Sequence, residues 1–517
     1  MAHARKPRPE ERQRALAAAL ADPACYGGDV REVRVAETHI SWVFLTGRYA
    51  YKVKKPVKLP FLDFSTLARR LHFCKEELRL NRRLAPELYL GVVPIGGSLS
   101  APRVGREPAI EYAVKMREFP ADARLDQKLA AGAVPASAIV GFATKLAEFH
   151  RTLPALHTDP KGRAAQGAAR DNVAALAQYA HGRLRAEVDA LRTWTERQCA
   201  ALAPVFAERA AAGAERECHG DLHLENLLWQ DGSIVAYDAL EFDRRLRDID
   251  VMSEAAFLAM DLIAHGRADL AHVFLNRYLE VSGDYAGIDV LRFYVAYRAL
   301  VRAKVRAIKA ADKRQPPRHD PYIATALGLM KARTPLLVLT HGLSGSGKTT
   351  LTDGLVGPLQ ALRVRSDLER KRLYGLAAEA RTGSGVGGGL YGAEGTRLTY
   401  DRLAAVADRA LRNGFNVIVD ATFLRRAERW AFRQIAAFHA ARFAILDCTA
   451  PAEELRRRIS ARSQAGKDAS EATLAVLERQ LATREPLDGS ELRSTVRVDT
   501  HEPVRHSGLA TLLMRRG

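Results

Sequence analysis

The segment LLVLTHGLSGSGKTT, residues 336–350, decides the fold of the C-terminal part of this 517-residue chain. An apolar run is followed by a glycine-rich turn, and residues 342–349 match the pattern G-x4-G-K-[ST] in full. In this pattern, backbone N–H groups wrap around a phosphate, the lysine bridges phosphates and the hydroxyl binds Mg²⁺. The residues that we expect to contact phosphate or metal are Gly342, Ser344, Gly345, Ser346, Gly347, Lys348, Thr349 and Thr350.

Further apolar runs surround this loop. NVIVDATF (416–423) and RFAILDC (442–448) are short strand candidates with helical segments between them. Strands that alternate with helices are typical of a parallel sheet, so we predict an α/β fold of the P-loop nucleotide-binding class. The glycine-rich stretch RTGSGVGGGLYG (381–392) is expected to be mobile.

Polar side chains that follow these strands are candidates for the chemistry. Asp367 ends the strand VRSD and is expected to orient or deprotonate an acceptor hydroxyl, while Arg370 holds a charged group of the acceptor. Asp420 ends the strand VIVD and is expected to act on Mg²⁺ directly or through water. Arg458 and Arg462 lie four residues apart on one helix face and are expected to close over the γ-phosphate. The alternatives are an ordinary helix cap with an exposed arginine, and a solvated arginine face.

Residues 335–500 resemble the small P-loop kinases that include polynucleotide kinase and zeta-toxin-type kinases. The resemblance is carried by GLSGSGKTT, SDLERK, VIVDATF and LRRRISARSQAGKDASEA. It implies transfer of a phosphoryl group from ATP to a hydroxyl, with Asp367 as the base on the acceptor side. It does not name the acceptor.

A second motif, HGDLHLEN (219–226), has the H-x-D-x4-N spacing of a kinase catalytic loop. Asp221 is expected to accept the proton of a substrate hydroxyl, and Asn226 to bind Mg²⁺. A hairpin turn at Asp231–Gly232 leads into a strand that ends at Asp238, where a second metal ligand belongs. This spacing predicts a catalytic loop and a metal-binding aspartate joined by a β-hairpin.

The N-terminal part supplies residues that would complete such a site. Residues 31–60 have the composition of strands, and residues 64–85 have leucines near helical spacing. Lys52, in Ala-Tyr-Lys, matches the A-x-K of a nucleotide-binding strand and is expected to contact the α- and β-phosphates. Glu77 on the following helix is its candidate ion-pair partner, and Met116–Phe119 is the candidate hinge beside the adenine.

Over about residues 30–310, the chain resembles the aminoglycoside phosphotransferase and choline-kinase branch of the protein-kinase-like fold. In that comparison, Asp250 of RDIDVM is expected to anchor the backbone of the catalytic loop. One departure is that no G-x-G-x-x-G loop joins the first two strands, where the chain has ETHISW. The expectation for nucleotide affinity is therefore weaker than that for the fold. The alternative is a decayed kinase that binds a ligand without turnover.

The histidines of this loop have two interpretations. We expect His219 to orient the loop, and the role of His223 stays open. A metal site made by these two histidines and Cys218 is a weaker alternative, since no remote ligand cluster supports it. The five cysteines are widely spaced without a C-x-x-C pair, so no disulfide framework is expected and a reducing cytoplasm is the natural compartment.

Together the two parts resemble the fused family often described as bifunctional aminoglycoside phosphotransferase and ATP-binding protein. The predicted fold is a two-domain chain, with an N-terminal α+β bilobal protein-kinase-like domain and a C-terminal α/β P-loop domain with a parallel sheet. The linker is predicted from the proline-rich stretch RQPPRHDP. The predicted bounds are an extension at 1–29, the kinase-like domain at 30–313 with lobes at about 30–120 and 121–313, a linker at 314–333 and the P-loop domain at 334–517.

Composition excludes several classes of protein. Hydrophobic residues make up 47% and charged residues 27%, which is typical of a globular chain and not of a disordered or fibrous one. No run approaches about 18 apolar residues, so no membrane span is expected. The formal net charge is +19, with both parts of the chain basic. Such a charge suits phosphate-bearing ligands and argues mildly against a polycationic aminoglycoside substrate.

We therefore expect an enzyme with two sites for ATP and Mg²⁺ that phosphorylates hydroxyl groups of small molecules. One alternative is a nucleic-acid 5′-hydroxyl kinase in the C-terminal part, although no interleaved aromatic residues support it. Another is that one site is a non-catalytic nucleotide sensor that regulates the other. The sequence names neither acceptor nor the oligomeric state.

Overall fold

The computed structural model describes residues 9–59, 62–312, 320–378, 380, 389–465 and 472–516. The chain forms two compact units. The first unit comprises Met1–Phe142, Phe149–Pro160 and Ala210–Leu258, and the second comprises Ala143–Glu148, Lys161–Arg209 and Ala259–Gly517. Residues 313–319, most of the proline-rich stretch of the predicted linker, lie outside the described residues. The domain bounds given above stay predictions.

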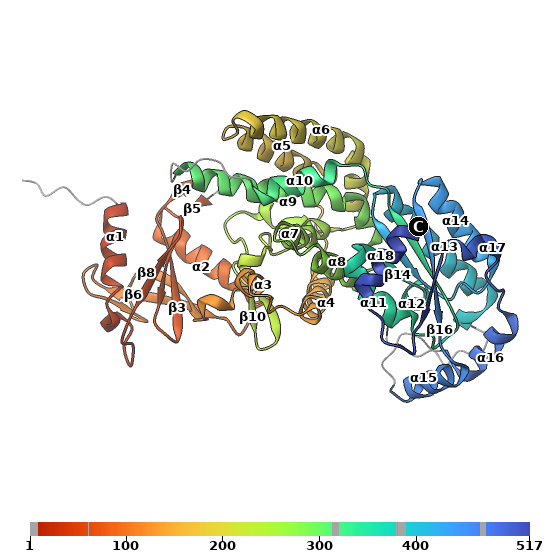
Figure 1. Cartoon of the computed structure of the whole chain (residues 1–517). Coiled ribbons are helices and arrows are strands. Elements are labelled where there is room, and N and C mark those ends of the chain that lie inside the picture. The colour runs from red at the N-terminus through yellow and green to blue at the C-terminus, as the bar shows by residue number, and fades with distance from the viewer. Residues whose placement is uncertain are drawn as a thin grey trace, which may run out of the picture. The chain divides into compact units, whose positions relative to one another are not determined.

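The first unit contains a six-stranded antiparallel sheet with the order β1-β2-β3-β8-β6-β7 (Figure 1). Its strands are β1 (Arg34–Glu37), β2 (Ser41–Leu45), β3 (Tyr49–Lys54), β6 (Tyr89–Gly97), β7 (Pro102–Val104) and β8 (Ala109–Arg117). The strands predicted within 31–60 are thus confirmed. A helix predicted at 64–85 is also present, although it is shorter.

Alternation along β3 decides which of its side chains face the site. The helices that pack on this sheet are α1 (Pro9–Ala19) and α2 (Leu67–Asn81). Ala50 packs in one apolar cluster with Cys74 of α2, and Tyr51 packs in another with Leu16 of α1. Lys52 therefore points to the same face as α2. The segment that we expected to be an N-terminal extension supplies α1 to the core of the sheet.

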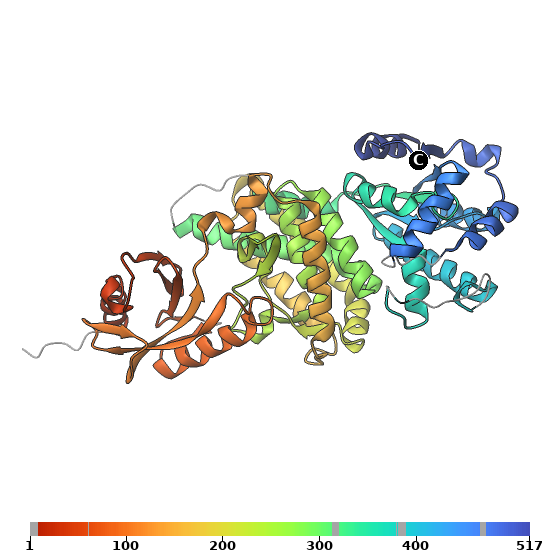
Figure 2. The ribbon, with the colours of Figure 1, turned by 90° about the horizontal axis from the view of Figure 1, so that it is seen from below.

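Helices dominate the alanine-rich middle of the chain. They are α3 (Leu125–Ala130), α4 (Ala136–Thr152), α5 (Arg163–Ala177), α6 (Gly182–Ala211), α7 (Val251–Ala264), α8 (Ala268–Ser282), α9 (Ile288–Asp312) and α10 (Pro321–Met330). Within the second unit, α9 packs along α5 and α10, and the green of α9 and the yellow of α5 distinguish these helices in Figure 2. Phe206 of α6 makes an edge-to-face contact with Phe293 of α9, with 5.1 Å between the ring centroids.

Among the described residues, three short strand pairs complete the first unit. They are β4 (Lys58–Leu59) with β5 (Leu62–Asp63), β9 (Glu215–Glu217) with β12 (Asp248–Asp250), and β10 (Leu227–Gln230) with β11 (Ser233–Ala236). The strands β9 and β10 flank the predicted catalytic loop in the chain. The turn between β10 and β11 has positive φ at both Asp231 and Gly232, which is the geometry of a tight hairpin. The predicted hairpin is confirmed, although β11 ends two residues before Asp238.

The second unit also holds a five-stranded parallel sheet with the order β14-β15-β13-β16-β17. Its strands are β13 (Leu336–His341), β14 (Ala361–Arg365), β15 (Asn416–Asp420), β16 (Arg442–Thr449) and β17 (Thr495–Asp499). The helices are α11 (Lys348–Leu359), α12 (Ser366–Leu373), α13 (Ala393–Arg412), α14 (Arg426–Phe438), α15 (Ala452–Ala465), α16 (Leu474–Thr483), α17 (Gly489–Leu492) and α18 (His506–Arg516). The predicted parallel α/β sheet is confirmed.

One apolar core fixes the start of α11 against this sheet. Leu336 and Val338 of β13 pack with Leu351 and Leu355 of α11 and with Leu513 of α18. The central strand therefore delivers the glycine-rich loop directly to the beginning of a buried helix. Among the described residues, no helix is long and apolar enough to cross a membrane.

Candidate active sites

The glycine-rich loop joins β13 to α11, and its glycines have conformations that other residues adopt with strain. Gly342, Gly345 and Gly347 have φ values of 144°, 81° and 76°. A Cβ atom on Gly342 would lie 2.4 Å from the carbonyl oxygen of Cys448, which is closer than atoms can approach. The loop can therefore keep this path only with glycine at that position.

Lys348 begins α11 and lies over the loop. Its Nζ donates to the carbonyl oxygens of Gly342 at 2.9 Å and Leu343 at 2.7 Å. The first N–H groups of α11 and its helix dipole add positive potential at the same place. The arrangement is suited to hold the phosphates of a nucleotide.

Asp420 lies beside the first turns of α11, at the end of β15. It is 5% exposed, and its Oδ2 accepts a hydrogen bond from Thr352 Oγ1 at 3.4 Å. Arg365, its register partner on β14, places Nε 3.8 Å from the same oxygen. A carboxylate oxygen here and the hydroxyl of Thr349 are hard oxygen ligands of the kind that Mg²⁺ takes, so these residues fit a metal site.

Arg458 of α15 supports the glycine-rich loop through hydrogen bonds. Its Nη1 donates to the carbonyl oxygen of Gly345 at 3.4 Å, and its Nη2 to that of Thr500 at 2.9 Å. Thr500 Oγ1 in turn donates to the carbonyl oxygen of Ser346 at 3.0 Å. Thr500 was missed in the sequence because it follows β17, far from any motif. Arg462 lies in α15, but its side chain is outside the described residues.

Asp367 and Arg370 lie on α12. Asp367 is in the first turn of this helix, since β14 ends at Arg365 and not at Asp367 as the sequence predicted. Arg370 is 7% exposed, and its Nη1 donates to the carbonyl oxygen of Leu390 at 2.9 Å. Its guanidinium also lies 5.0 Å from the ring centre of Tyr391. The glycine-rich residues 381–388, expected to be mobile, lie outside the described residues.

A pocket of about 350 Å³ opens beside the loop. It is lined by Gly347, Thr350, Leu351, Arg458, Thr500, Glu502, Val504 and His506. Since Gly347 and Thr350 belong to the phosphate-binding segment, the pocket adjoins the position of the phosphates. Thr350, expected from the sequence to contact the nucleotide, lines this pocket.

The second candidate site lies in the first unit, around Lys52. Lys52 Nζ is 2.5 Å from Asp238 Oδ1 and 2.9 Å from Glu77 Oε1. Asp238 has a positive φ of 62°, and its backbone N–H donates to Tyr89 Oη at 3.1 Å. The structure thus brings together the three side chains that the sequence placed in separate motifs.

A second lysine two residues along β3 shares Glu77 with Lys52. Lys54 Nζ donates to Glu77 Oε2 at 2.7 Å and forms a short contact with Glu241, and both acids are buried. Burial opposes ionisation of Glu77, yet Lys52 and Lys54 lower its pKa to about 2. Burial raises the pKa of Glu241 despite Lys54. Glu77 is therefore the ionised partner that fixes both lysines. Sequence reasoning missed Lys54 and Glu241, although the period of two in a strand points to Lys54.

The catalytic-loop residues meet as their spacing predicts. Asn226 Nδ2 donates to Asp221 Oδ2 at 2.9 Å and to the Asp221 carbonyl oxygen at 3.0 Å. His223 Nε2 lies 3.2 Å from Asp221 Oδ2, and its ring packs against Phe257. Asp221 is therefore held from two sides, and the oxygens of Asn226 and Asp238 form a donor set that fits Mg²⁺.

His219 orients this loop. Its Nε2 donates to the Tyr237 carbonyl oxygen at 2.9 Å, and its Nδ1 accepts from the Asp221 N–H at 3.4 Å. Burial lowers the pKa of His219, which favours the neutral ring that this pattern requires. Nearby, Phe119 of the predicted hinge makes an edge contact with Tyr237.

Glu254 of α7 anchors the loop's backbone, a role that we expected of Asp250. Its carboxylate accepts from the backbone N–H groups of His219 at 3.1 Å and Gly220 at 2.7 Å, and from His150 Nε2 at 2.9 Å. Asp250, for which the role stays a prediction, accepts from the Met252 N–H at the start of α7. Burial opposes ionisation of Glu254, yet these hydrogen bonds and the two histidines lower its pKa to about 2.

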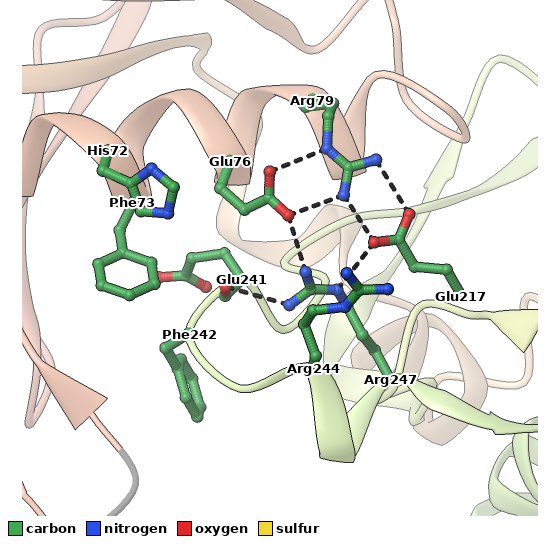
Figure 3. Close-up of a pocket in the computed structure, with 9 residues that line it drawn as sticks. All are labelled: His72, Phe73, Glu76, Arg79, Glu217, Glu241, Phe242, Arg244 and Arg247. Carbon is green, nitrogen blue, oxygen red and sulfur yellow. Dashed lines mark hydrogen bonds and ion pairs between the residues drawn. The ribbon is translucent and has the colours of Figure 1, made fainter. Parts of the chain in front are cut away.

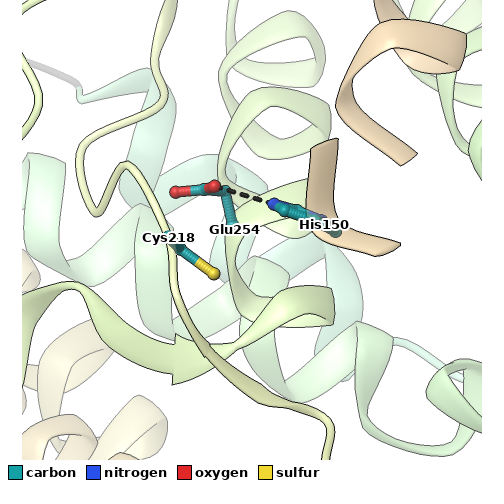
Figure 4. A group of neighbouring side chains, drawn as sticks. All are labelled: His150, Cys218 and Glu254. Carbon is teal, nitrogen blue, oxygen red and sulfur yellow. Dashed lines mark hydrogen bonds and ion pairs between the residues drawn. The ribbon is translucent and has the colours of Figure 1, made fainter. Parts of the chain in front are cut away.

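From the sequence, Cys218 was considered as a metal ligand together with two histidines of the catalytic loop. The structure gives it other neighbours. It lies with His150 and Glu254, their ligand atoms within 4.8 Å of one another, rather than with His219 and His223 (Figure 4). The Glu254 carboxylate already accepts the three hydrogen bonds just described. We therefore interpret this group as the support of the catalytic loop.

Replacing Glu254 by glutamine is expected to lower the free energy of unfolding at pH 7 by about 2 kcal/mol, because charge-assisted hydrogen bonds to a buried group are lost. The folded-state pKa of about 2 lies below the ordinary value of 4.5. The ionised carboxylate therefore stabilises the fold above about pH 4.5, and this contribution disappears as the pH falls towards 2.

Denaturant unfolding between pH 3 and 7 measures this difference, with the exposed Glu87→Gln as the control. The difference in the free energy of unfolding between the unsubstituted chain and the Glu254 variant should become smaller as the pH falls. A difference in the free energy of unfolding that does not change with pH would contradict the role of the ionised Glu254 carboxylate.

A charged pocket of about 280 Å³ lies behind α2 (Figure 3). Arg247, which is 2% exposed, links Glu76 of α2 at 2.7 Å with the carbonyl oxygen of Glu241 at 3.1 Å. Arg79 bridges Glu76 and Glu217, at 2.7 Å from each. The charges of these acids and arginines compensate one another. Their ion pairs hold α2, which carries Glu77, against the segment around the catalytic loop.

Two parts of the chain match known families. Residues 62–293 match the family described as phosphotransferase enzyme family, and residues 337–487 match the family described as AAA domain. Among solved structures, a choline/ethanolamine kinase family protein from Mesorhizobium loti is 15% identical, covers 61% of this chain and 91% of its own, and has a TM-score of 0.37. The Mycobacterium tuberculosis APS kinase is 19% identical, covers 36% of this chain and 98% of its own, and has a TM-score of 0.26.

Curated relatives cover nearly the whole chain. Uncharacterized proteins of Mycobacterium tuberculosis and Mycobacterium bovis are each 32% identical to it over 456 residues, which is 87% of this chain and 90% of theirs. The chain belongs to the family of these mycobacterial proteins, and its two matched regions make it a kinase with a phosphotransferase-family part followed by an AAA domain.

Proposed function

We propose that this kinase uses ATP and Mg²⁺ to phosphorylate hydroxyl groups of small molecules at two separate sites. The observation that carries the proposal is the contact of Lys52 with both Glu77 and Asp238 in the first unit. It supports a site in which Lys52 serves as the cation for the phosphates and Asp238 as a carboxylate for the metal, with the Asp221–Asn226 pair on the acceptor side. The second unit has its own phosphate-binding loop with Lys348 and Asp420.

At the first site, Asp221 is the proposed general base. It accepts the proton of the acceptor hydroxyl while the hydroxyl oxygen attacks the γ-phosphorus, and the bond from that phosphorus to the bridging oxygen breaks. The products are the phosphate ester and ADP. Lys52 neutralises charge on the remaining phosphates, and its contact with Glu77 keeps it in place.

At the second site, Lys348 and the loop N–H groups are proposed to neutralise the phosphates, with Asp367 as the base for the acceptor. The pocket that Gly347 and Thr350 line is proposed to take the nucleoside of the donor, since it adjoins the phosphate loop. Mg²⁺, when bound, would screen phosphate charge at both sites. Asn226 and Asp238 would hold it at the first site, and Thr349 and Asp420 at the second.

The experiment is transfer of labelled γ-phosphate from ATP into a panel of hydroxylated metabolites and 5′-hydroxyl oligonucleotides. The unsubstituted chain is compared with Asp221→Ala and Lys348→Ala. We expect each substitution to remove a different labelled small molecule.

Three other results would contradict parts of the proposal. If Lys348→Ala removed every labelled product and Asp221→Ala removed none, the first site would be a binding or regulatory module. Label in oligonucleotides that disappears with added salt would favour a nucleic-acid kinase. An absence of any labelled product would leave neither site with the proposed activity.

A further inference from the structure

A buried ion pair joins α8 to the edge strand of the parallel sheet within the second unit. Arg363 of β14 donates from Nη2 to Glu280 Oε1 at 2.8 Å and from Nε to the same oxygen at 3.2 Å. Arg363 is 5% exposed and Glu280 is 6% exposed. A buried pair of this kind is costly to disrupt on one side only, since the remaining charge loses its partner.

Asn276 of α8 strengthens the contact by pairing with the backbone of the same strand. Its Oδ1 accepts from the Arg363 N–H at 2.6 Å, and its Nδ2 donates to the Ala361 carbonyl oxygen at 3.4 Å. Strand β14 is at the sheet edge, where such groups otherwise lack a partner strand. Helix α8 belongs to the region that matches the phosphotransferase family, whereas β14 belongs to the region that matches the AAA domain.

The other side of the Arg363 guanidinium reaches the phosphate-loop helix. Its Nη1 donates to the Thr349 carbonyl oxygen at 3.3 Å and to Thr352 Oγ1 at 3.0 Å. Thr352 in turn contacts Asp420 at 3.4 Å. One continuous network therefore connects Glu280 with both residues of the proposed metal site.

The charges around Arg363 explain how Glu280 acts on that site. Burial opposes the positive charge of Arg363, but Glu280, Asp353 and Asp420 together raise its pKa. Asp353 Oδ1 is 2.6 Å from Arg363 Nη2. Without the charge of Glu280, the guanidinium would be attracted more strongly to the remaining carboxylates, and it would compete with a cation for Asp420.

We propose that Glu280 is a positioning residue for the phosphate-loop site, which it serves by holding Arg363 so that Thr349 and Asp420 can take Mg²⁺. A helix of the phosphotransferase-family region is thereby a working part of the AAA domain's metal site. This inference rests on the proposed function of that site.

The test is Glu280→Gln, which removes the charge and keeps the shape. The measured quantity is ATP binding at the phosphate-loop site, which is the binding that Lys348→Ala abolishes. It is measured by calorimetry in the full-length chain at a series of Mg²⁺ concentrations. We expect half-maximal binding to need about five- to tenfold more Mg²⁺, with ATP affinity in the presence of a chelator little changed. Glu280→Asp, which restores the charge, should recover most of the Mg²⁺ affinity.

The matched control is Asp289→Asn, in α9 of the same unit. Asp289 pairs with Arg409 at 3.0 Å and with Asn413 at 2.8 Å, both at the end of α13 and not in the phosphate loop. It should leave the Mg²⁺ requirement unchanged while lowering the melting temperature.

An equal shift in both variants, or none in Glu280→Gln, would overturn the positioning role. A failure of Glu280→Asp to recover Mg²⁺ affinity would do the same. If the unsubstituted chain showed no ATP binding sensitive to Lys348→Ala, the proposed function itself would fall, and the inference with it.

Discussion

Replacing Lys348 by alanine is expected to lower phosphoryl transfer at the phosphate-loop site by roughly 10²–10³-fold. The lysine ammonium lies over the loop, within 2.9 Å of two of its carbonyl oxygens. It supplies a charge that the loop N–H groups cannot replace. Alanine is a good helix former, so the start of α11 should persist. The measurement is kcat/KM for the product assigned to this site.

Lys331→Ala is the matched control, because this exposed lysine follows α10 and makes no contact with the loop that the structure records. It should transfer phosphate at the unsubstituted rate. Lys348→Ala with that same rate would exclude the loop as the source of the product. Its far-ultraviolet circular dichroism should match that of the unsubstituted chain.

Replacing Asp221 by alanine is expected to lower kcat at the first site by roughly 10²–10⁴-fold, the usual contribution of a general base. KM for ATP should change little, since Asp221 contacts Asn226 and His223, whereas Lys52 binds Glu77 and Asp238. The split between kcat and KM distinguishes loss of a base from loss of nucleotide binding.

Asp122→Ala is the control for this change, because Asp122 is an exposed residue of the same unit in a surface pair with Lys128. It should have no effect on either constant. An unchanged kcat in Asp221→Ala would show that another group accepts the proton. A large rise in KM with kcat preserved would place Asp221 in binding instead.

Sequence motifs predict best where neighbouring residues act together. The path of the loop at Gly342 and the meeting of Asp221 with Asn226 follow from local spacing, so both could be predicted. The Lys52–Glu77 contact could also be predicted, because one residue lies on a strand and the other on the helix that packs on it. To predict these contacts, it is enough to know the regular spacing of side chains along a helix or strand and one packing contact between two such elements.

Residues that support the sites were harder to predict. Glu254 was not expected to anchor the catalytic loop, but it lies in the first turn of α7, which carries its carboxylate to the loop. Thr500 follows the last strand, and only the folded sheet brings it to Ser346. The partner of Arg363 lies 83 residues earlier in the chain. No local pattern signals an ion pair of such sequence separation.

The pairing of Asn276 with the edge of β14 has a consequence for cutting the chain in two. A fragment that begins after the proline-rich stretch would carry an uncovered strand edge and a guanidinium without its carboxylate. Open strand edges recruit strands of other molecules, so we expect such a fragment to aggregate. The solubility of the AAA-domain region is thus expected to depend on a helix of the phosphotransferase-family region.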